Sequence, residues 1–170
     1  MVTFHNGNIL DSGADIICHQ VNCQGKMNSG VAKAIREKWP QVYDEYIQKY
    51  KDRENEILLS CSSFEHIPST SETLLGDIQV VFIADKKTMA VVNMFAQENY
   101  GYDGRRYTSY DAFWSCLGEI KRTINPGLRI AFPARIGCVR GGANWDVILT
   151  MIKEVLGADY NVEIWDYDKG

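Results

Sequence analysis

Apolar residues form two kinds of pattern that alternate along the chain. Short apolar runs predict strands that are buried on both faces, because such strands have no solvent-facing side to make polar. These runs occupy residues 15–21, 78–83, 89–95, 128–132 and 162–165. Apolar residues that recur every three or four positions predict amphipathic helices over residues 31–39, 41–51 and 107–123, and again from residue 145 onward.

Strand and helix alternate in this order, which predicts a layered α/β fold around a largely parallel sheet. No internal repeat, low-complexity tract or linker divides the chain, so we expect a single domain over residues 1–170. In sheets of this kind, ligands bind beyond the carboxyl ends of the strands, where loops lead into helix N-termini.

Two loops occupy such positions, and both are rich in small residues. The first loop, residues 23–31, contains Gly25, Ser29 and Gly30; the second loop, residues 133–145, contains three glycines and Arg140. Main-chain N–H groups at a helix start bind phosphate, and a glycine lets the ligand approach the backbone closely. Either loop alone is equally consistent with a tight turn, but the pair favours a diphosphate ligand.

Composition and charge narrow the function further. The chain has 170 residues, of which 45% are hydrophobic and 24% charged, which is typical of a globular domain. Its 18 basic and 22 acidic residues give a net charge of -4, and the absence of a basic surplus argues against nucleic acid as a partner. A small anionic ligand remains compatible, since backbone donors bind phosphate without net positive charge.

The cysteines and the start of the chain bear on location. The five cysteines are odd in number and scattered, and they include no CxxC pair, which argues against disulfides and structural zinc and favours a reducing compartment. No apolar run reaches the 18 or more residues of a membrane span, and the first residues lack the pattern of a signal peptide. We therefore expect a cytoplasmic protein with no membrane partner.

Four segments resemble the macro domain family and keep its order and spacing over nearly the whole chain. They are GNIL at residues 7–10, IICHQVNCQGKMNSGVAKAI at 16–35, VVNMFAQ at 91–97 and AFPARIGCVRGGANWDVI at 131–148. The resemblance implies a three-layer α/β/α macro domain with a mixed, largely parallel central sheet. It also implies that the partner is ADP-ribose or an ADP-ribose derivative, ADP-ribosylated protein included, with no cofactor and no metal ion.

Within that family, the first two segments look most like the branch that removes phosphate from ADP-ribose-1″-phosphate. The resemblance to this branch implies that His19 and Asn22 are the catalytic residues. The branch that cleaves ADP-ribose from glutamate uses a lysine where Gln97 follows Ala96, and an aspartate where Gly141 stands. Cleavage by that lysine mechanism is therefore not expected.

The resemblance also implies which residues bind each part of the ligand. It places Asn8 and Ile9 beside the adenine, and Gly30, Val31 and Phe95 with Asn22 around the distal ribose; the diphosphate is wrapped by Gly137, Cys138, Val139, Arg140, Gly141 and Gly142. Two departures from the family pattern matter. The usual glycine run of the first loop is reduced to Asn28-Ser29-Gly30, and the second loop carries the bulky pair Val139-Arg140. Bulk at these points either narrows the pocket, or Arg140 favours a ligand that carries one more phosphate.

Alternatives remain open for the residues and for the function. An imidazole such as that of His19 orients water or transfers a proton near neutral pH, but a strand histidine bonded to its neighbour is the simpler interpretation. Asn22 is either a ribose ligand or a buried structural amide, and no covalent role is assigned to Cys23. The leading hypothesis is a hydrolase of an ADP-ribose derivative. The alternatives are a non-catalytic ADP-ribose reader, an ADP-ribosyl-protein hydrolase with a non-lysine mechanism, and an RNA-binding module.

Overall fold

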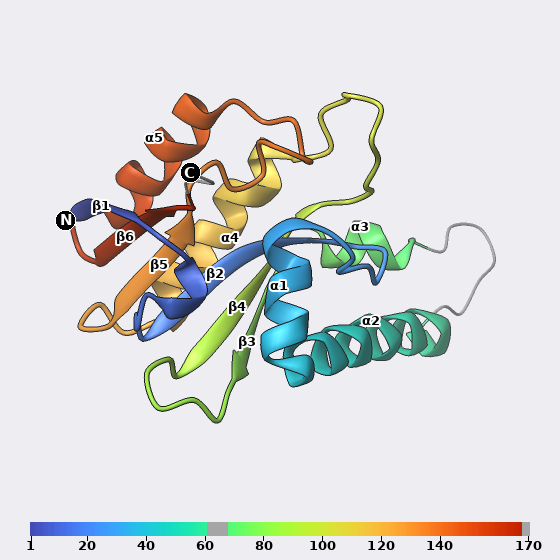
Figure 1. Cartoon of the computed structure of the whole chain (residues 1–170). Coiled ribbons are helices and arrows are strands. Elements are labelled where there is room, and N and C mark those ends of the chain that lie inside the picture. The colour runs from blue at the N-terminus through green and yellow to red at the C-terminus, as the bar shows by residue number, and fades with distance from the viewer. Residues whose placement is uncertain (61–67, 168–170) are drawn as a thin grey trace.

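The computed structural model describes residues 1–60 and 68–167, and its centre is one mixed sheet of six strands (Figure 1). The strand order is β1-β6-β5-β2-β4-β3, and every neighbouring pair is parallel except β3 and β4. The strands are β1 (Val2–Asn6), β2 (Ile16–Asn22), β3 (Ile78–Phe82), β4 (Ala90–Gln97), β5 (Arg129–Pro133) and β6 (Asn161–Asp166).

Helices cover both faces of this sheet, so the fold has three layers (Figure 1). A short 3-10 turn, η1 (Ile9–Asp11), precedes β2. One face is covered by α1 (Gly30–Lys38), α2 (Pro40–Ser60) and α3 (Thr70–Leu74), and the other by α4 (Tyr110–Thr123) and α5 (Trp145–Leu156). The prediction of a three-layer α/β fold with a mixed, largely parallel sheet is confirmed.

Alternate residues of the central strands fill two separate cores. On β2, Cys18 packs with α4 and α5, whereas Ile17 and Val21 pack with Ile35 of α1 and Tyr46 of α2. Because successive strand residues point to opposite faces, a strand enclosed by two helical layers must be apolar on both. The buried pattern of β2 and β4 therefore explains why their sequences show continuous apolar runs.

Some elements differ from the sequence prediction. Strand β1 was not predicted, because it lies at the sheet edge and Phe4 within it is largely exposed. Helix α3 was also missed; its five residues are held by a capping box between Ser69 and Glu72. Helix α2 runs to Ser60 rather than ending at residue 51, and α4 starts at Tyr110 rather than 107. Within residues 1–60 and 68–167, no helix is long and apolar enough to cross a bilayer.

Candidate functional site

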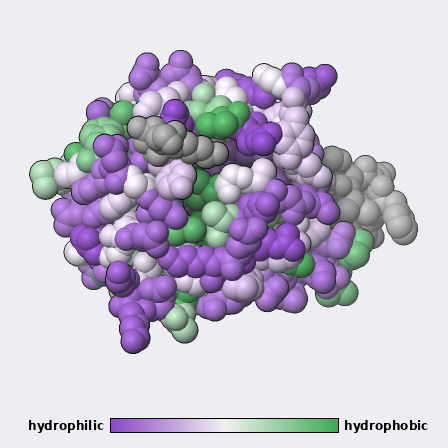
Figure 2. Space-filling view, in the orientation of Figure 1, coloured by the Kyte–Doolittle hydropathy of each residue, from purple (hydrophilic) through white to green (hydrophobic). Residues whose placement is uncertain are grey.

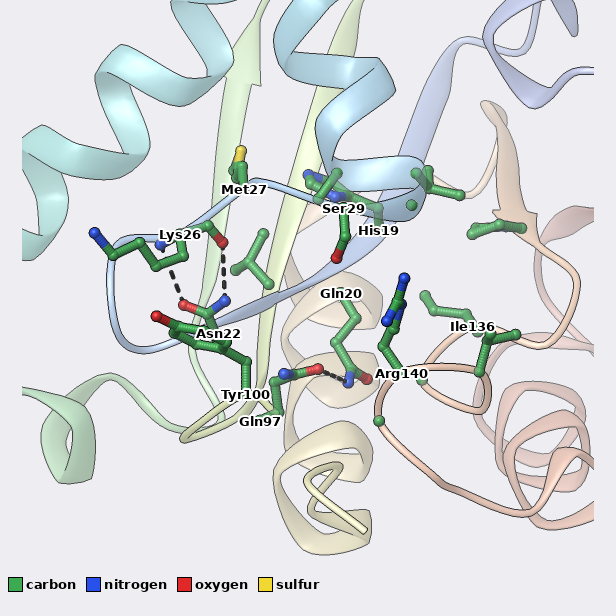
Figure 3. A pocket seen from close by; sticks show the side chains of 18 of the residues that line it. His19, Gln20, Asn22, Lys26, Met27, Ser29, Gln97, Tyr100, Ile136 and Arg140 are labelled. Carbon is green, nitrogen blue, oxygen red and sulfur yellow. Dashed lines mark hydrogen bonds between the residues drawn. The ribbon is translucent and has the colours of Figure 1, made fainter. Parts of the chain in front are cut away.

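A cavity of about 460 Å³ opens beyond the carboxyl ends of β2, β4 and β5 (Figure 3). This volume lies within the range of ordinary small-molecule sites. Figure 2 shows that hydrophilic side chains cover most of the face of the molecule that is seen in the orientation of Figure 1. The lining comes from β2, the last residues of β4 and β5, the first turn of α1, the two glycine-containing loops and the segment after β4. It consists of His19, Gln20, Val21, Asn22, Lys26, Met27, Asn28, Ser29, Gly30, Val31, Ala32, Gln97, Tyr100, Gly101, Tyr102, Pro133, Ala134, Arg135, Ile136, Gly137, Val139, Arg140 and Gly141.

The Asn22 side chain folds the first loop. Its Oδ1 accepts hydrogen bonds from the main-chain N–H groups of Gln24 (3.0 Å) and Lys26 (3.3 Å), and its Nδ2 donates to the Lys26 carbonyl (2.8 Å; Figure 3). Tyr46 of α2 is fully buried below the loop, and its one hydroxyl hydrogen is shared between the main-chain oxygen (2.6 Å) and Oδ1 (3.0 Å) of Asn22. The same hydroxyl accepts from the Gly25 N–H at 3.1 Å. The Asn22 oxygen is therefore saturated, and one Nδ2 hydrogen remains for a ligand.

Replacing Tyr46 by phenylalanine is expected to lower the free energy of unfolding by about 1–3 kcal/mol, because the Gly25 N–H and the Asn22 oxygens lose a buried partner. Denaturant titration measures this difference. Tyr43→Phe is the matched control on the same helix, since the Tyr43 hydroxyl makes no hydrogen bond within the described residues. Equal stability of the Tyr46 and Tyr43 variants would show that the hydroxyl does not hold the loop.

His19 lies deep in the cavity wall and is almost fully buried. Its Nε2 lies 2.5 Å from Oδ1 of Asn93 on the neighbouring strand β4, whereas its Nδ1 has no partner among the described residues. Burial lowers the pKa of His19 from 6.5 to about 4, and the hydrogen bond to Asn93 opposes the shift only in part. The imidazole is therefore neutral at pH 7, so it acts there as a hydrogen-bond acceptor or base rather than as an acid.

Gln20 connects the strands to the second loop. Its Nε2 donates to Oε1 of Gln97 (2.7 Å; Figure 3) and to Oγ1 of Thr108 (2.8 Å), and the Thr108 hydroxyl donates to the Gly137 carbonyl (2.7 Å). The second loop packs directly on this network. A Cβ on Gly137 would lie 2.7 Å from Gln20 Oε1, and one on Gly141 would overlap the Thr108 hydroxyl. Glycine is thus required at both positions by close approach, and at Gly137 also by a φ of +72°.

The two helix N-termini next to the loops differ. The Ser29 side chain makes no capping hydrogen bond, so the first N–H groups of α1, whose residues line the cavity, have no side-chain cap. At α5, by contrast, Asn144 Oδ1 accepts from the N–H groups of Asp146 (2.8 Å) and Val147 (3.3 Å), and Asn144 does not line the cavity. The expectation that both helix starts are open to an anion therefore holds for α1 alone.

The cavity is cationic although the chain is acidic. Three cations, Lys26, Arg135 and Arg140, are among the described residues that line it, and no aspartate or glutamate is. Arg135 is held in the left-handed region (φ +59°) and pairs with Asp166 at 2.7 Å. The Arg140 guanidinium lies 4.4 Å from the ring centre of Tyr102. Figure 3 shows the Arg140 side chain pointing from the second loop into the cavity, where its charge favours an anionic ligand.

The structure brings together most, but not all, of the residues predicted to form the site. The lining contains His19, Asn22, Gly30, Val31, Gly137, Val139, Arg140 and Gly141. It does not contain Asn8, which caps η1, or Ile9 and Phe95, which belong to the core. Cys138 and Gly142 also lie outside it; a Cβ on Gly142 would meet the main chain of Arg105 and Arg106. Contact with a ligand stays a prediction for all the predicted site residues, those that line the cavity included.

Several lining residues were not predicted from the sequence. Gln20 and Lys26 lie inside the segment 16–35 that resembles the macro domain family, but neither was assigned a role. Gln97 entered the sequence comparison only because the branch that cleaves ADP-ribose from glutamate has a lysine at this point. Tyr100 and Tyr102, which follow β4, also line the cavity; their sequence is consistent either with capping a ligand or with anchoring a loop.

The thiols near the cavity are not suited to covalent catalysis. Burial raises the pKa of Cys23 to about 12 and that of Cys138 to about 11, so neither is a thiolate at neutral pH. In the described part of the chain, no cluster of three or more His, Cys, Asp and Glu side chains could hold a metal ion. Cys61 and His66 lie outside the described residues.

Comparison with known proteins supports the fold. No family model matches the chain. A DNA ADP-ribosyl glycohydrolase from Thermus aquaticus is 23% identical over 99% of this chain, which spans only 41% of that relative's length. The macrodomain of Thermus aquaticus DarG has a TM-score of 0.72 at 22% identity, covering 99% of this chain and 98% of its own. Thermosipho africanus DarTG in complex with ADP-ribose has a TM-score of 0.72 at 16% identity, covering 98% of this chain and 42% of its own. The chain therefore has the macro domain fold.

Proposed function

We propose that this macro domain binds ADP-ribose in the cavity and hydrolyses an ADP-ribose derivative at the distal ribose. The observation that carries the proposal is the charge of the cavity in a chain of net charge -4. Of the described residues that line it, none is a carboxylate, and Lys26 and Arg140 are cations in addition to Arg135, which pairs with Asp166. The uncapped N-terminus of α1 on the same wall adds backbone donors and a favourable dipole for an anion. The Thermosipho africanus DarTG structure, which has the same fold, is a complex with ADP-ribose.

In this proposal the diphosphate lies between the start of α1 and the second loop, within reach of Arg140. An arginine at this point pairs with phosphate through two parallel hydrogen bonds. The distal ribose then extends toward His19, Asn22 and Gln97, which line the same cavity.

The reaction that suits these groups is hydrolysis of a phosphomonoester at the 1″ position. A water molecule attacks phosphorus and forms a new P–O bond while the bond from phosphorus to the ribose oxygen breaks. The water gives a proton to His19 Nδ1, and His19 or solvent water then delivers a proton to the ribose oxygen, which gives ADP-ribose and orthophosphate. A neutral imidazole with a free nitrogen fits the role of base, and backbone donors stabilise the charge that develops on the phosphoryl oxygens.

A second candidate substrate is ADP-ribosylated single-stranded nucleic acid. Tyr100 and Tyr102 line the cavity and are 47% and 70% exposed, and Arg140 lies over the Tyr102 ring. Exposed aromatic rings beside arginine are the combination on which unpaired bases stack. The Thermus aquaticus relative is described as a DNA ADP-ribosyl glycohydrolase, which also favours this candidate.

A panel of substrates distinguishes these possibilities. The protein is incubated with ADP-ribose-1″-phosphate, an ADP-ribosylated DNA oligonucleotide and a glutamate-ADP-ribosylated protein, and released ADP-ribose is measured by chromatography. We expect turnover of the phosphomonoester. Turnover of the oligonucleotide alone favours the second candidate, and binding of ADP-ribose without turnover of any substrate identifies a reader.

A further inference from the structure

Two buried side-chain atoms have no hydrogen-bond partner within the described residues, and both belong to residues that line the cavity. They are Nδ1 of His19 and Oε1 of Gln20, consecutive residues near the end of β2. A buried polar atom without a partner costs free energy, so such atoms are rare in folded proteins outside functional sites. Their position suggests that a ligand or a reacting water completes them.

A chain of hydrogen bonds that ends on the backbone determines which ring nitrogen of His19 carries the hydrogen. Gln79 of β3 donates from Nε2 to the Glu45 carbonyl at 2.9 Å, and a carbonyl can only accept. Gln79 Oε1 must then be the atom that accepts from Asn93 Nδ2, at 3.1 Å. Asn93 is therefore oriented with Oδ1 toward His19, and Nε2 of His19 must donate to it. A neutral imidazole that carries its hydrogen on Nε2 leaves Nδ1 as a bare acceptor.

We propose that Asn93 is a positioning residue for His19, held by Gln79, which fixes the tautomer that turns the unprotonated Nδ1 toward the ligand. The inference rests on the proposed function and deepens it. The Nδ1 lone pair accepts a hydrogen bond from a hydroxyl of the distal ribose or from the attacking water. The alternative tautomer would present an N–H at the same point, and it could neither accept from a hydroxyl nor take a proton from water.

The groups around His19 favour the neutral ring. Lys26, Arg135 and Arg140 are the charged side chains among the described residues that line the same cavity, and none of them carries a negative charge that would favour an imidazolium. Tyr46 of α2, whose pKa burial raises above its usual value, stays protonated and uncharged. On β3 and β4, the side chains bonded toward His19 are the uncharged amides Gln79 and Asn93.

The tautomer can be observed directly by NMR of the imidazole nitrogens, since the chain has only three histidines. His19 signals are assigned from their loss in His19→Gln. In the free protein we expect Nε2 protonated and Nδ1 bare, and saturation with ADP-ribose should shift the Nδ1 resonance. Protonation at Nδ1 in the free protein would overturn the inference. If calorimetry shows that ADP-ribose is bound but the Nδ1 resonance does not move, the inference is also overturned, while the proposed function stands. If calorimetry shows no binding of ADP-ribose, the proposed function itself is removed.

Substitution of Asn93 gives a kinetic test that a purely structural role would not reproduce. In Asn93→Asp, a carboxylate beside Nε2 raises the pKa of His19, so turnover of ADP-ribose-1″-phosphate should be at least about 10-fold below wild type at pH 6 and recover toward pH 9. KM should change little, because Asn93 does not line the cavity. Asn161→Asp at the start of β6 makes the same charge change in an exposed position and should leave the pH profile unaltered. A loss of turnover in Asn93→Asp that is equal at all pH values would contradict the proposal.

Discussion

Gly141→Ala is expected to lower the affinity for ADP-ribose by about 100-fold, equivalent to about 2.8 kcal/mol. A Cβ at this position would overlap the Thr108 hydroxyl and the main-chain oxygen of Gly137, and it would lie 3.1 Å from Nε2 of Gln20. Main-chain oxygen cannot rotate away, so the second loop must shift. The shift displaces the backbone donors proposed for the diphosphate and breaks the contacts between Gln20, Thr108 and the loop.

Calorimetric titration measures this effect, and thermal unfolding separates it from a general loss of stability. Gly118→Ala is the matched control, because a Cβ there would meet nothing within 4 Å on the exposed side of α4. The control should bind ADP-ribose like wild type and unfold at a slightly higher temperature, since alanine is favoured over glycine in a helix by about 0.5–1 kcal/mol. Wild-type affinity in Gly141→Ala would mean that the second loop does not contact the ligand.

His19→Ala is expected to reduce turnover of ADP-ribose-1″-phosphate by about 100-fold, at the lower end of the range for general-base catalysis. The low end applies because burial lowers the pKa of His19 to about 4, and a base with so low a pKa takes protons weakly. Affinity for ADP-ribose should fall by no more than about 10-fold, because the phosphate contacts lie elsewhere in the cavity and only the hydrogen bond between the distal ribose and His19 is lost. His5→Ala is the control, because His5 stacks on Trp165 and does not line the cavity. Unchanged turnover in His19→Ala would remove the catalytic role of this residue.

The same pKa sets the pH dependence of activity and stability. Wild-type turnover should stay constant as pH falls below 6.5 and decline only as pH approaches 4, where His19 becomes protonated. Between pH 6.5 and 4 the unfolded chain binds a proton at this residue that the folded chain does not, so stability falls as pH is lowered through that window. In His19→Ala this contribution to the loss of stability should be absent.

The sequence predicts the sheet and the loops better than it predicts the inner part of the cavity. Buried strands and glycine-containing loops leave local patterns, which is why β2, β4 and both loops were found. Strand β1 and helix α3 leave weak patterns, because one is a half-exposed edge and the other has only five residues. Tyr46, Asn93 and Gln79 act through contacts between residues distant in the chain, so no local pattern could identify them.

The local charge at the cavity also could not be predicted from the sequence. Net charge is a property of the whole chain, and its value of -4 argued against nucleic acid. The fold gathers Lys26, Arg135 and Arg140 at one cavity, so the local charge has the opposite sign. Any interpretation of ligand or partner from charge therefore depends on which residues the fold brings together.

The measurement that tests the central claim most directly is calorimetric titration of the wild-type protein with ADP-ribose, with AMP and ADP as controls. The cavity geometry predicts micromolar binding of ADP-ribose and markedly weaker binding of AMP and ADP, because the distal ribose reaches the inner wall at His19 and Asn22. No binding of ADP-ribose, or equal binding of all three nucleotides, would contradict the account. The chain would then have the macro domain fold without the proposed ligand site.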